Sequence, residues 1–175
     1  MDHIDFKDRP TSHRVTEMNA EYGNLDAETV VLFLRFQEVA RRLQSAYDDV
    51  LAQFDLSESK FIILMFLKRA GTEGLSVSTI AEKLGVTKAT TSKLVHALVK
   101  QGFVTQTPSQ ADKRATVVKS TSLGQQKLAA FLPHNFSTVN TMMTGLNPAD
   151  RTTLTQLLGT LDQGIQSLTH SQEMS

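Results

Sequence analysis

Lysine, threonine and histidine side chains gather in one short segment that follows Gly85. The candidate ligand-binding residues of this segment are Thr87, Lys88, Thr90, Thr91, Lys93 and His96. Lysine ammonium groups bind phosphate oxygens and guanine edges, and threonine hydroxyls can bond to bases or to phosphates. Such side chains on one short helix are therefore suited to contact with a nucleic-acid backbone and groove.

The same segment has a simpler interpretation, which is a solvated helix face capped by Thr87. That interpretation would be favoured for an isolated helix. A preceding turn, a following basic hairpin and a local excess of positive charge favour DNA instead. Thr91 also suits an inward orientation, because it stands beside the apolar positions Leu94, Val95 and Leu98.

A second candidate cluster, Asp112-Lys113-Arg114, lies at the predicted tip of that hairpin. A planar guanidinium on a protruding hairpin can enter the negative potential of a narrow minor groove, so Arg114 is the leading candidate. Asp112 can hold that arginine in position or shape the turn. Lys113 suits a phosphate contact or a solvated position. The alternative for Arg114 is a mobile surface arginine.

The net charge of zero conceals an uneven distribution along the chain. Residues 75–119 contain seven basic and two acidic residues, a net charge of +5, and the remainder carries −5. A basic module on an acidic body directs polyanions to one face and repels them from the other.

The elements expected to position these residues form a helix-turn-helix followed by a hairpin. Helices are predicted near 77–84 and 88–101, joined at Gly85 and ended by Gly102 as a left-handed cap. Strands are predicted at 103–107 and 115–120. Two short helices and a basic hairpin in this order suit insertion into a major groove, with the hairpin as a wing.

Helices are predicted on both sides of this module. Apolar residues recur at helical spacing from a cap at Asp26 to about residue 54, and a further helix spans about 57–69. Residues 123–144 are apolar-periodic but contain Pro133, which predicts a kink or a break. A last helix begins at Asn147-Pro148. We call its apolar positions the leucine stripe: Leu154, Leu157, Leu158, Leu161, Ile165 and Leu168.

A terminal helix with such a stripe needs a partner, for which the long helix from residue 26 is the candidate, in the same chain or in a symmetry mate. The predicted fold class is all-α with a small β-wing. A winged helix-turn-helix at 57–121 is flanked by dimerisation helices at 26–54 and 123–170. Residues 26–175 form one domain, and residues 1–25 form a polar N-terminal arm.

Other kinds of chemistry find little support. There is no cysteine, which excludes disulfides, thiolate metal sites and thiol redox sensing. The five histidines show no metal-ligand spacing, so no metal or cofactor is predicted. No Gly-rich phosphate loop or nucleophile elbow occurs, so no enzymatic activity is expected. No apolar run reaches the roughly 20 residues of a membrane span, and no secretion signal is evident, so a cytoplasmic location is expected.

The wing signature Asp112-Lys-Arg114, followed by the Thr-x-x-Gly turn from Thr121 to Gly124, resembles that of the MarR family of bacterial regulators. The specific motifs lie in residues 75–124, and the helical pattern over about 26–170 also agrees. The resemblance implies a homodimer built from the N- and C-terminal helices. It implies binding to palindromic double-stranded DNA, with recognition helices in major grooves and wing arginines in minor grooves.

Members of this family are usually repressors, and many leave DNA when a small aromatic or phenolic molecule binds between the two regions. We therefore expect a dimeric, sequence-specific repressor released by an effector, with no effector residues assigned. The alternatives are an activator or ligand-independent regulator, and a winged-helix adaptor for protein interactions.

Overall fold

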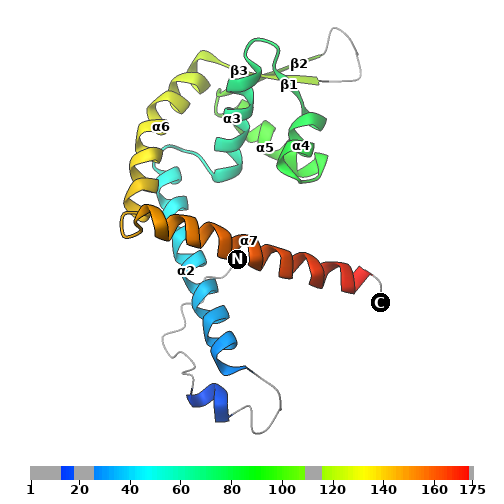
Figure 1. Ribbon diagram of the computed structural model, residues 1–175. Helices are drawn as coiled ribbons and strands as arrows, with labels where there is room; N and C mark the ends of the chain where they lie inside the picture. Colours follow the sequence, from blue (N-terminus) through cyan, green and yellow to red (C-terminus); the bar gives the residue numbers. More distant parts are fainter. Residues whose placement is uncertain (1–12, 18–25, 109–115, 174–175) are drawn as a thin grey trace.

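The computed structural model describes residues 13–17, 26–108 and 116–173. It is helical apart from one small sheet, and the predicted fold class is confirmed (Figure 1). In chain order the labelled elements are α2 (Ala27–Ala52), α3 (Glu58–Ala70), β1 (Leu75–Ser76), α4 (Val77–Leu84), α5 (Lys88–Lys100), β2 (Val104–Pro108), β3 (Thr116–Ser120), α6 (Ser122–Met142) and α7 (Pro148–Glu173).

Local capping explains where several helices begin. The Asp26 carboxylate accepts hydrogen bonds from the amides of Glu28 and Thr29, as predicted for the start of α2. At the start of α7, Asn147 Oδ1 accepts hydrogen bonds from the amides of Ala149 and Asp150, and the Asp150 carboxylate accepts one from the Asn147 amide. This reciprocal pair is a capping box.

Glycines end the helices of the central module. Gly85 has φ +67° at the turn between α4 and α5, and Gly102 has φ +74° two residues after the end of α5. Both conformations lie in the left-handed region, where a side chain would be strained. The predicted turn and the predicted cap are confirmed.

The sheet has strand order β1-β3-β2 and is antiparallel throughout. Strands β2 and β3 form the predicted hairpin, with Val104 opposite Ser120 and Pro108 opposite Thr116. The two-residue strand β1 was not predicted from the sequence. It pairs through Leu75 and Val118, and so fastens the start of α4 to the wing.

The core lies where α3, α4, α5 and the sheet meet the C-terminal end of α2 and the first half of α6. Its fully buried members include Leu51, Ile63, Ile80, Leu98 and Phe131. The rings of Phe54 and Phe61 both pack edge-on against Phe131, with centroids 5.2 and 5.0 Å away. Residues from α2 and α6 thus belong to the same core as the winged module.

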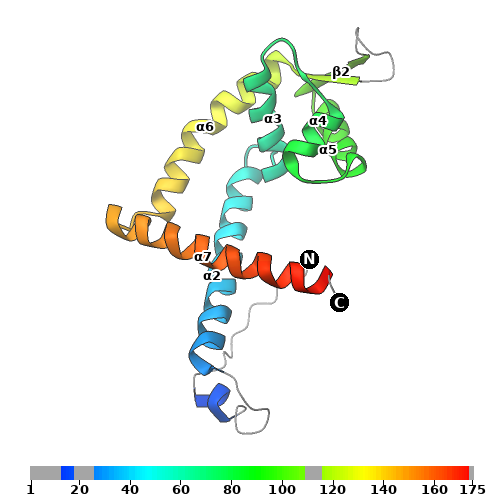
Figure 2. The same cartoon turned by 45° about the vertical axis from the view of Figure 1, so that its right-hand side comes forward.

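Beyond this core the three long helices extend away from the module. Helices α2 and α6 descend from it as two arms, and α7 crosses the line of α2 in both views (Figures 1 and 2). The leucine stripe is exposed along α7. Leu32 and Phe33 near the start of α2 are also exposed, at 68% and 54%.

Pro133 does not break α6, which continues through it from Ser122 to Met142 and follows a curved path (Figure 1). Of the two predicted outcomes, a kink or a break, the break does not occur, and the helix bends instead. A proline removes one amide donor and crowds the carbonyl four residues earlier, and bending the helix accommodates both. Among the described residues, no helix combines the length and the apolar composition that a membrane span requires.

Candidate nucleic-acid interface

The N-terminal end of α5 is shaped by Thr87. Its hydroxyl accepts a hydrogen bond from the Thr90 amide at 3.2 Å and lies 3.0 Å from the Thr90 hydroxyl. Lys88 and Thr90 are both exposed beside it. The capping role of Thr87 is thus observed, and its position keeps Lys88 at the positive end of the helix dipole, where anions are stabilised.

Thr91 does not belong to this surface. Its side chain is fully buried, and its hydroxyl donates to the Thr87 carbonyl at 3.1 Å. The position lies on the same side of α5 as the buried Val95 and Leu98. Thr91 was included among the predicted DNA contacts, and this assignment is corrected: the residue packs inside the fold and supports the first turn of α5.

The opposite side of α5 presents a continuous exposed stripe, which we call the outward face. It consists of Ala89, Ser92, Lys93, His96 and Lys100. The spacing from Ala89 to Lys93, His96 and Lys100 is four, seven and eleven residues, which places these side chains along one side of a helix.

Lys93 and His96 on this face were predicted from the sequence, whereas Ala89, Ser92 and Lys100 were not assigned. The signal that could have found them is the helical period itself. Once Val95 and Leu98 are placed inside, the residues on the far side of the helix follow.

Positive charge is concentrated on the exterior of the module. Lys83, Lys88, Lys93, Lys100 and Lys119 are all exposed, on α4, α5 and β3. The Lys83 ammonium lies 5.9 Å from the centroid of the Phe66 ring, a cation–π distance that ties it to α3. Five lysines on one small module can neutralise several phosphates.

The predicted wing residues Asp112, Lys113 and Arg114 lie outside the described residues. The paired ends of β2 and β3, Pro108 and Thr116, fix where the segment joining the strands leaves the sheet. The roles of these three residues stay predictions. Within the described part of the chain, no group of three or more potential ligand residues could hold a metal ion.

Comparison with known proteins decides the family. The sequence model of the MarR family matches residues 54–115, which contain α3, β1, α4, α5 and β2 of the winged module. The transcriptional repressor YetL of Bacillus subtilis is 32% identical over 158 residues, covering 90% of this chain and 95% of YetL. The chain belongs to the MarR family. Its resemblance to that family, argued from the wing signature, is confirmed, and its relatives are named as transcriptional regulators.

Solved structures show the same MarR fold. Sco3205, a MarR family transcriptional regulator of Streptomyces coelicolor solved in complex with DNA, aligns with a TM-score of 0.71 at 22% identity, over 82% of this chain and 91% of Sco3205. The heme sensor PefR of Streptococcus agalactiae, solved with heme, aligns with a TM-score of 0.64 at 24% identity, over 75% of this chain and 92% of PefR.

Proposed function

We propose that this MarR protein is a dimeric, sequence-specific repressor that acts on cytoplasmic DNA. The observation that supports this most strongly is the outward face of α5. It presents Lys93, His96 and Lys100 in one row, supported from behind by the buried Thr91 and Val95. In a helix-turn-helix, such a helix enters the major groove with its exposed row against base edges and phosphates.

The likeness to relatives agrees with this role. YetL, which the chain matches over nearly its whole length, is named a repressor, and Sco3205 was solved bound to DNA. Arg114 would add a minor-groove contact from the wing, held by Asp112, while Lys113 and Lys88 would contact phosphates.

The dimer would form through the long helices outside the winged module, at 26–54 and 123–170. Apolar side chains are exposed there in numbers that a monomer in water rarely tolerates. On α2 and the second half of α6 they are Leu32, Phe33, Leu34, Phe36, Val39, Leu43, Phe136 and Val139. Together with the leucine stripe, these residues would be covered by the same surfaces of a second copy, as in an isologous dimer.

Release from DNA would follow from a small molecule that binds between the winged module and the dimerisation helices. PefR is named a heme sensor, so a MarR fold of this kind can respond to a ligand. An effector would bind more tightly to a dimer conformation in which the two recognition helices cannot both reach their major grooves. Activation or ligand-independent regulation is the alternative within DNA binding.

A winged-helix adaptor that binds only proteins is the alternative from another class. It would need neither a palindromic DNA target nor exposed lysines along the outward face of α5.

The test is titration of the purified protein into duplexes selected from genomic fragments, repeated over a range of salt concentrations. We expect one palindromic site with half-sites about 34 Å apart, and affinity that falls steeply with salt. Equal affinity for unrelated duplexes would contradict sequence-specific regulation. An absence of DNA binding at low salt would favour the adaptor.

A further inference from the structure

Asp55 lies in the short turn between α2 and α3 and has an unusual backbone conformation. Its φ is +56°, and it is the one non-glycine residue with a positive φ among the described residues. Aspartate enters the left-handed region at some cost in free energy and stays there when its surroundings hold it.

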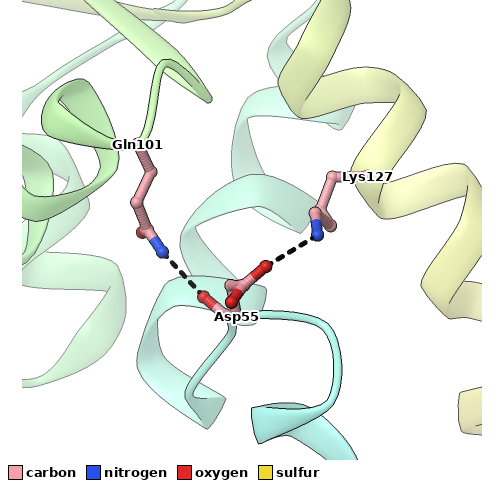
Figure 3. Close-up of polar contacts among 3 residues, drawn as sticks. All are labelled: Asp55, Gln101 and Lys127. Atoms are coloured by element: carbon pink, nitrogen blue, oxygen red, sulfur yellow. Dashed lines mark hydrogen bonds and ion pairs between the residues drawn. The ribbon is translucent and has the colours of Figure 1, made fainter.

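Two contacts from distant parts of the chain hold Asp55 (Figure 3). Gln101 Nε2 donates to the Asp55 carbonyl oxygen at 2.9 Å, and Lys127 Nζ lies 3.1 Å from Asp55 Oδ2. Gln101 directly follows α5, and Lys127 lies in α6. Asp55 thus connects the C-terminal end of α5 both to the end of α2, which it follows, and to α6. We call these three residues the Asp55 joint.

Gln101 fixes the C-terminal end of α5 in a definite position. The backbone amide of Gln101 donates to the Ala97 carbonyl, so Gln101 is the C-terminal cap of α5. Its Oε1 is buried without a hydrogen-bond partner among the described residues. If the side-chain amide were turned by 180°, Oε1 would face the Asp55 carbonyl oxygen, and both atoms are acceptors. Only the orientation with Nε2 toward Asp55 is therefore favourable.

Lys127 adds a second attachment from α6. Its side chain is 24% exposed, and its ammonium lies 5.5 Å from the centroid of the Phe103 ring, at the entrance to β2. The charge is thus placed between the Asp55 carboxylate and an aromatic face, and both interactions favour the same position. Asp55 itself is 71% exposed, so this ion pair contributes little to overall stability.

We propose that the Asp55 joint sets the angle between the recognition helix α5 and the dimerisation helices. The 13 residues of α5 make a lever about 20 Å long. A rotation of about 5° at the joint would move the N-terminal end of α5 by about 1.7 Å. One base pair changes the distance between half-sites by about 3.4 Å and turns one half-site by about 35° relative to the other, so a loosened joint would reduce the loss of affinity at altered spacings.

This inference rests on the proposed function, since spacing has meaning only for a dimer on a palindrome. The experiment measures Kd for the selected operator and for operators with one base pair inserted or deleted between the half-sites. The proteins are wild type, Lys127→Met, Asp55→Asn, the double variant Lys127→Met/Asp55→Asn, and Lys127→Arg. Asp55→Asn keeps the backbone carbonyl and tolerates the left-handed conformation, and removes only the carboxylate. Lys68→Met, at an exposed lysine of α3, matches the change in charge.

The readout is the Kd for each altered operator divided by the Kd for the selected operator. A fraction of unfolded protein raises both values equally, so a merely structural defect leaves the ratio unchanged. We expect Lys127→Met and Asp55→Asn to lower this ratio about three- to fivefold, and the double variant to lower it no further. Lys127→Arg and Lys68→Met should retain the wild-type ratio. Ratios equal to wild type in all variants would overturn the joint, whereas failure of the wild type to bind any operator would overturn the proposed function instead.

Discussion

At the residue scale, one polar pair connects α2 to α6. The Tyr47 hydroxyl donates to Asn135 Oδ1 at 2.7 Å, and Asn135 is buried. Burial raises the pKa of Tyr47 above its ordinary value of 10.0, and the negative charge of Glu58 raises it further. The folded state thus favours the neutral phenol, which keeps the donor that Asn135 needs.

We expect Tyr47→Phe to lower the free energy of unfolding by about 1–3 kcal/mol, because it leaves a buried amide oxygen without a donor. Since the folded pKa is the higher one, the contribution of Tyr47 is present below pH 10 and declines as the pH rises further. Urea unfolding of both proteins at neutral and at alkaline pH measures the difference. Tyr47→Phe/Asn135→Leu should recover part of the loss, and equal stability of the single variant and wild type would refute the assignment.

Gly124 lies against backbone at the start of α6. A Cβ at this position would lie 2.0 Å from the Phe103 carbonyl oxygen, which is itself bonded to the Thr121 amide. We expect Gly124→Ala to destabilise the fold by about 3 kcal/mol, since neither backbone segment can yield easily. Gly159→Ala is the control, because its Cβ meets nothing within 4 Å and the exchange favours a helix. Thermal unfolding should give a lower melting temperature for Gly124→Ala than for Gly159→Ala. Similar melting temperatures for the two variants would contradict the close packing at Gly124.

At this scale the sequence predicted those features that depend only on residues close together along the chain. Caps such as Asp26 and Asn147, and left-handed glycines such as Gly102, depend on neighbours within a few residues, and they were predicted correctly. The Asp55 joint and the Tyr47–Asn135 bond join residues 46 to 88 positions apart. No local pattern marks such pairs, so only the folded arrangement shows them.

At the element scale, α5 has a buried and an exposed side, and its exposed side should determine affinity for DNA. We expect Lys93→Ala to weaken operator binding and to reduce the slope of log affinity against log salt by about one, if its ammonium neutralises one phosphate. Fluorescence anisotropy at several salt concentrations provides both values.

Lys68→Ala removes the same charge from an exposed site on α3 and serves as the control. We expect it to leave the salt slope close to that of wild type. If both lysine variants changed the slope equally, the effect would come from overall charge and not from the outward face.

Element boundaries were predicted well because they follow from periodicity and glycine positions. The order of helices, turn and hairpin was correct, and Thr91 was misplaced by its hydroxyl-rich surroundings. A threonine one turn before Val95 shares its side of the helix, and its hydroxyl can bond to the carbonyl four residues earlier, as it does here. The β1 strand was missed because two residues contain no period.

At the scale of the whole molecule, the exposed apolar surfaces of the long helices require cover. Leu157 lies in the leucine stripe and is 62% exposed. We expect Leu157→Asp to shift the protein from dimer to monomer, because a buried carboxylate without a partner is costly. Sedimentation velocity would show the shift. Val86→Asp is the control, since Val86 is 40% exposed but lies between α4 and α5 in the winged module. An unchanged dimer in the Leu157 variant would contradict this interface.

The sequence indicated that the leucine stripe needs a partner, and it left open whether that partner is the same chain or a second copy. The exposure of the stripe in the folded chain favours a second copy. The dimer geometry itself could not be deduced, because the angle between a helix and its partner depends on side-chain packing across the interface.

Sequencing of genomic fragments bound by the purified protein, with Leu157→Asp and Lys93→Ala in parallel, tests most directly whether a dimer reads DNA with α5. We expect wild type to enrich one palindromic site with half-sites one helical turn apart. We expect both variants to lose most of that enrichment, Leu157→Asp because it cannot dimerise and Lys93→Ala because it lacks a DNA contact. Enrichment by the monomeric variant equal to that of wild type, or no enriched site at low salt, would contradict a dimer that reads DNA with α5.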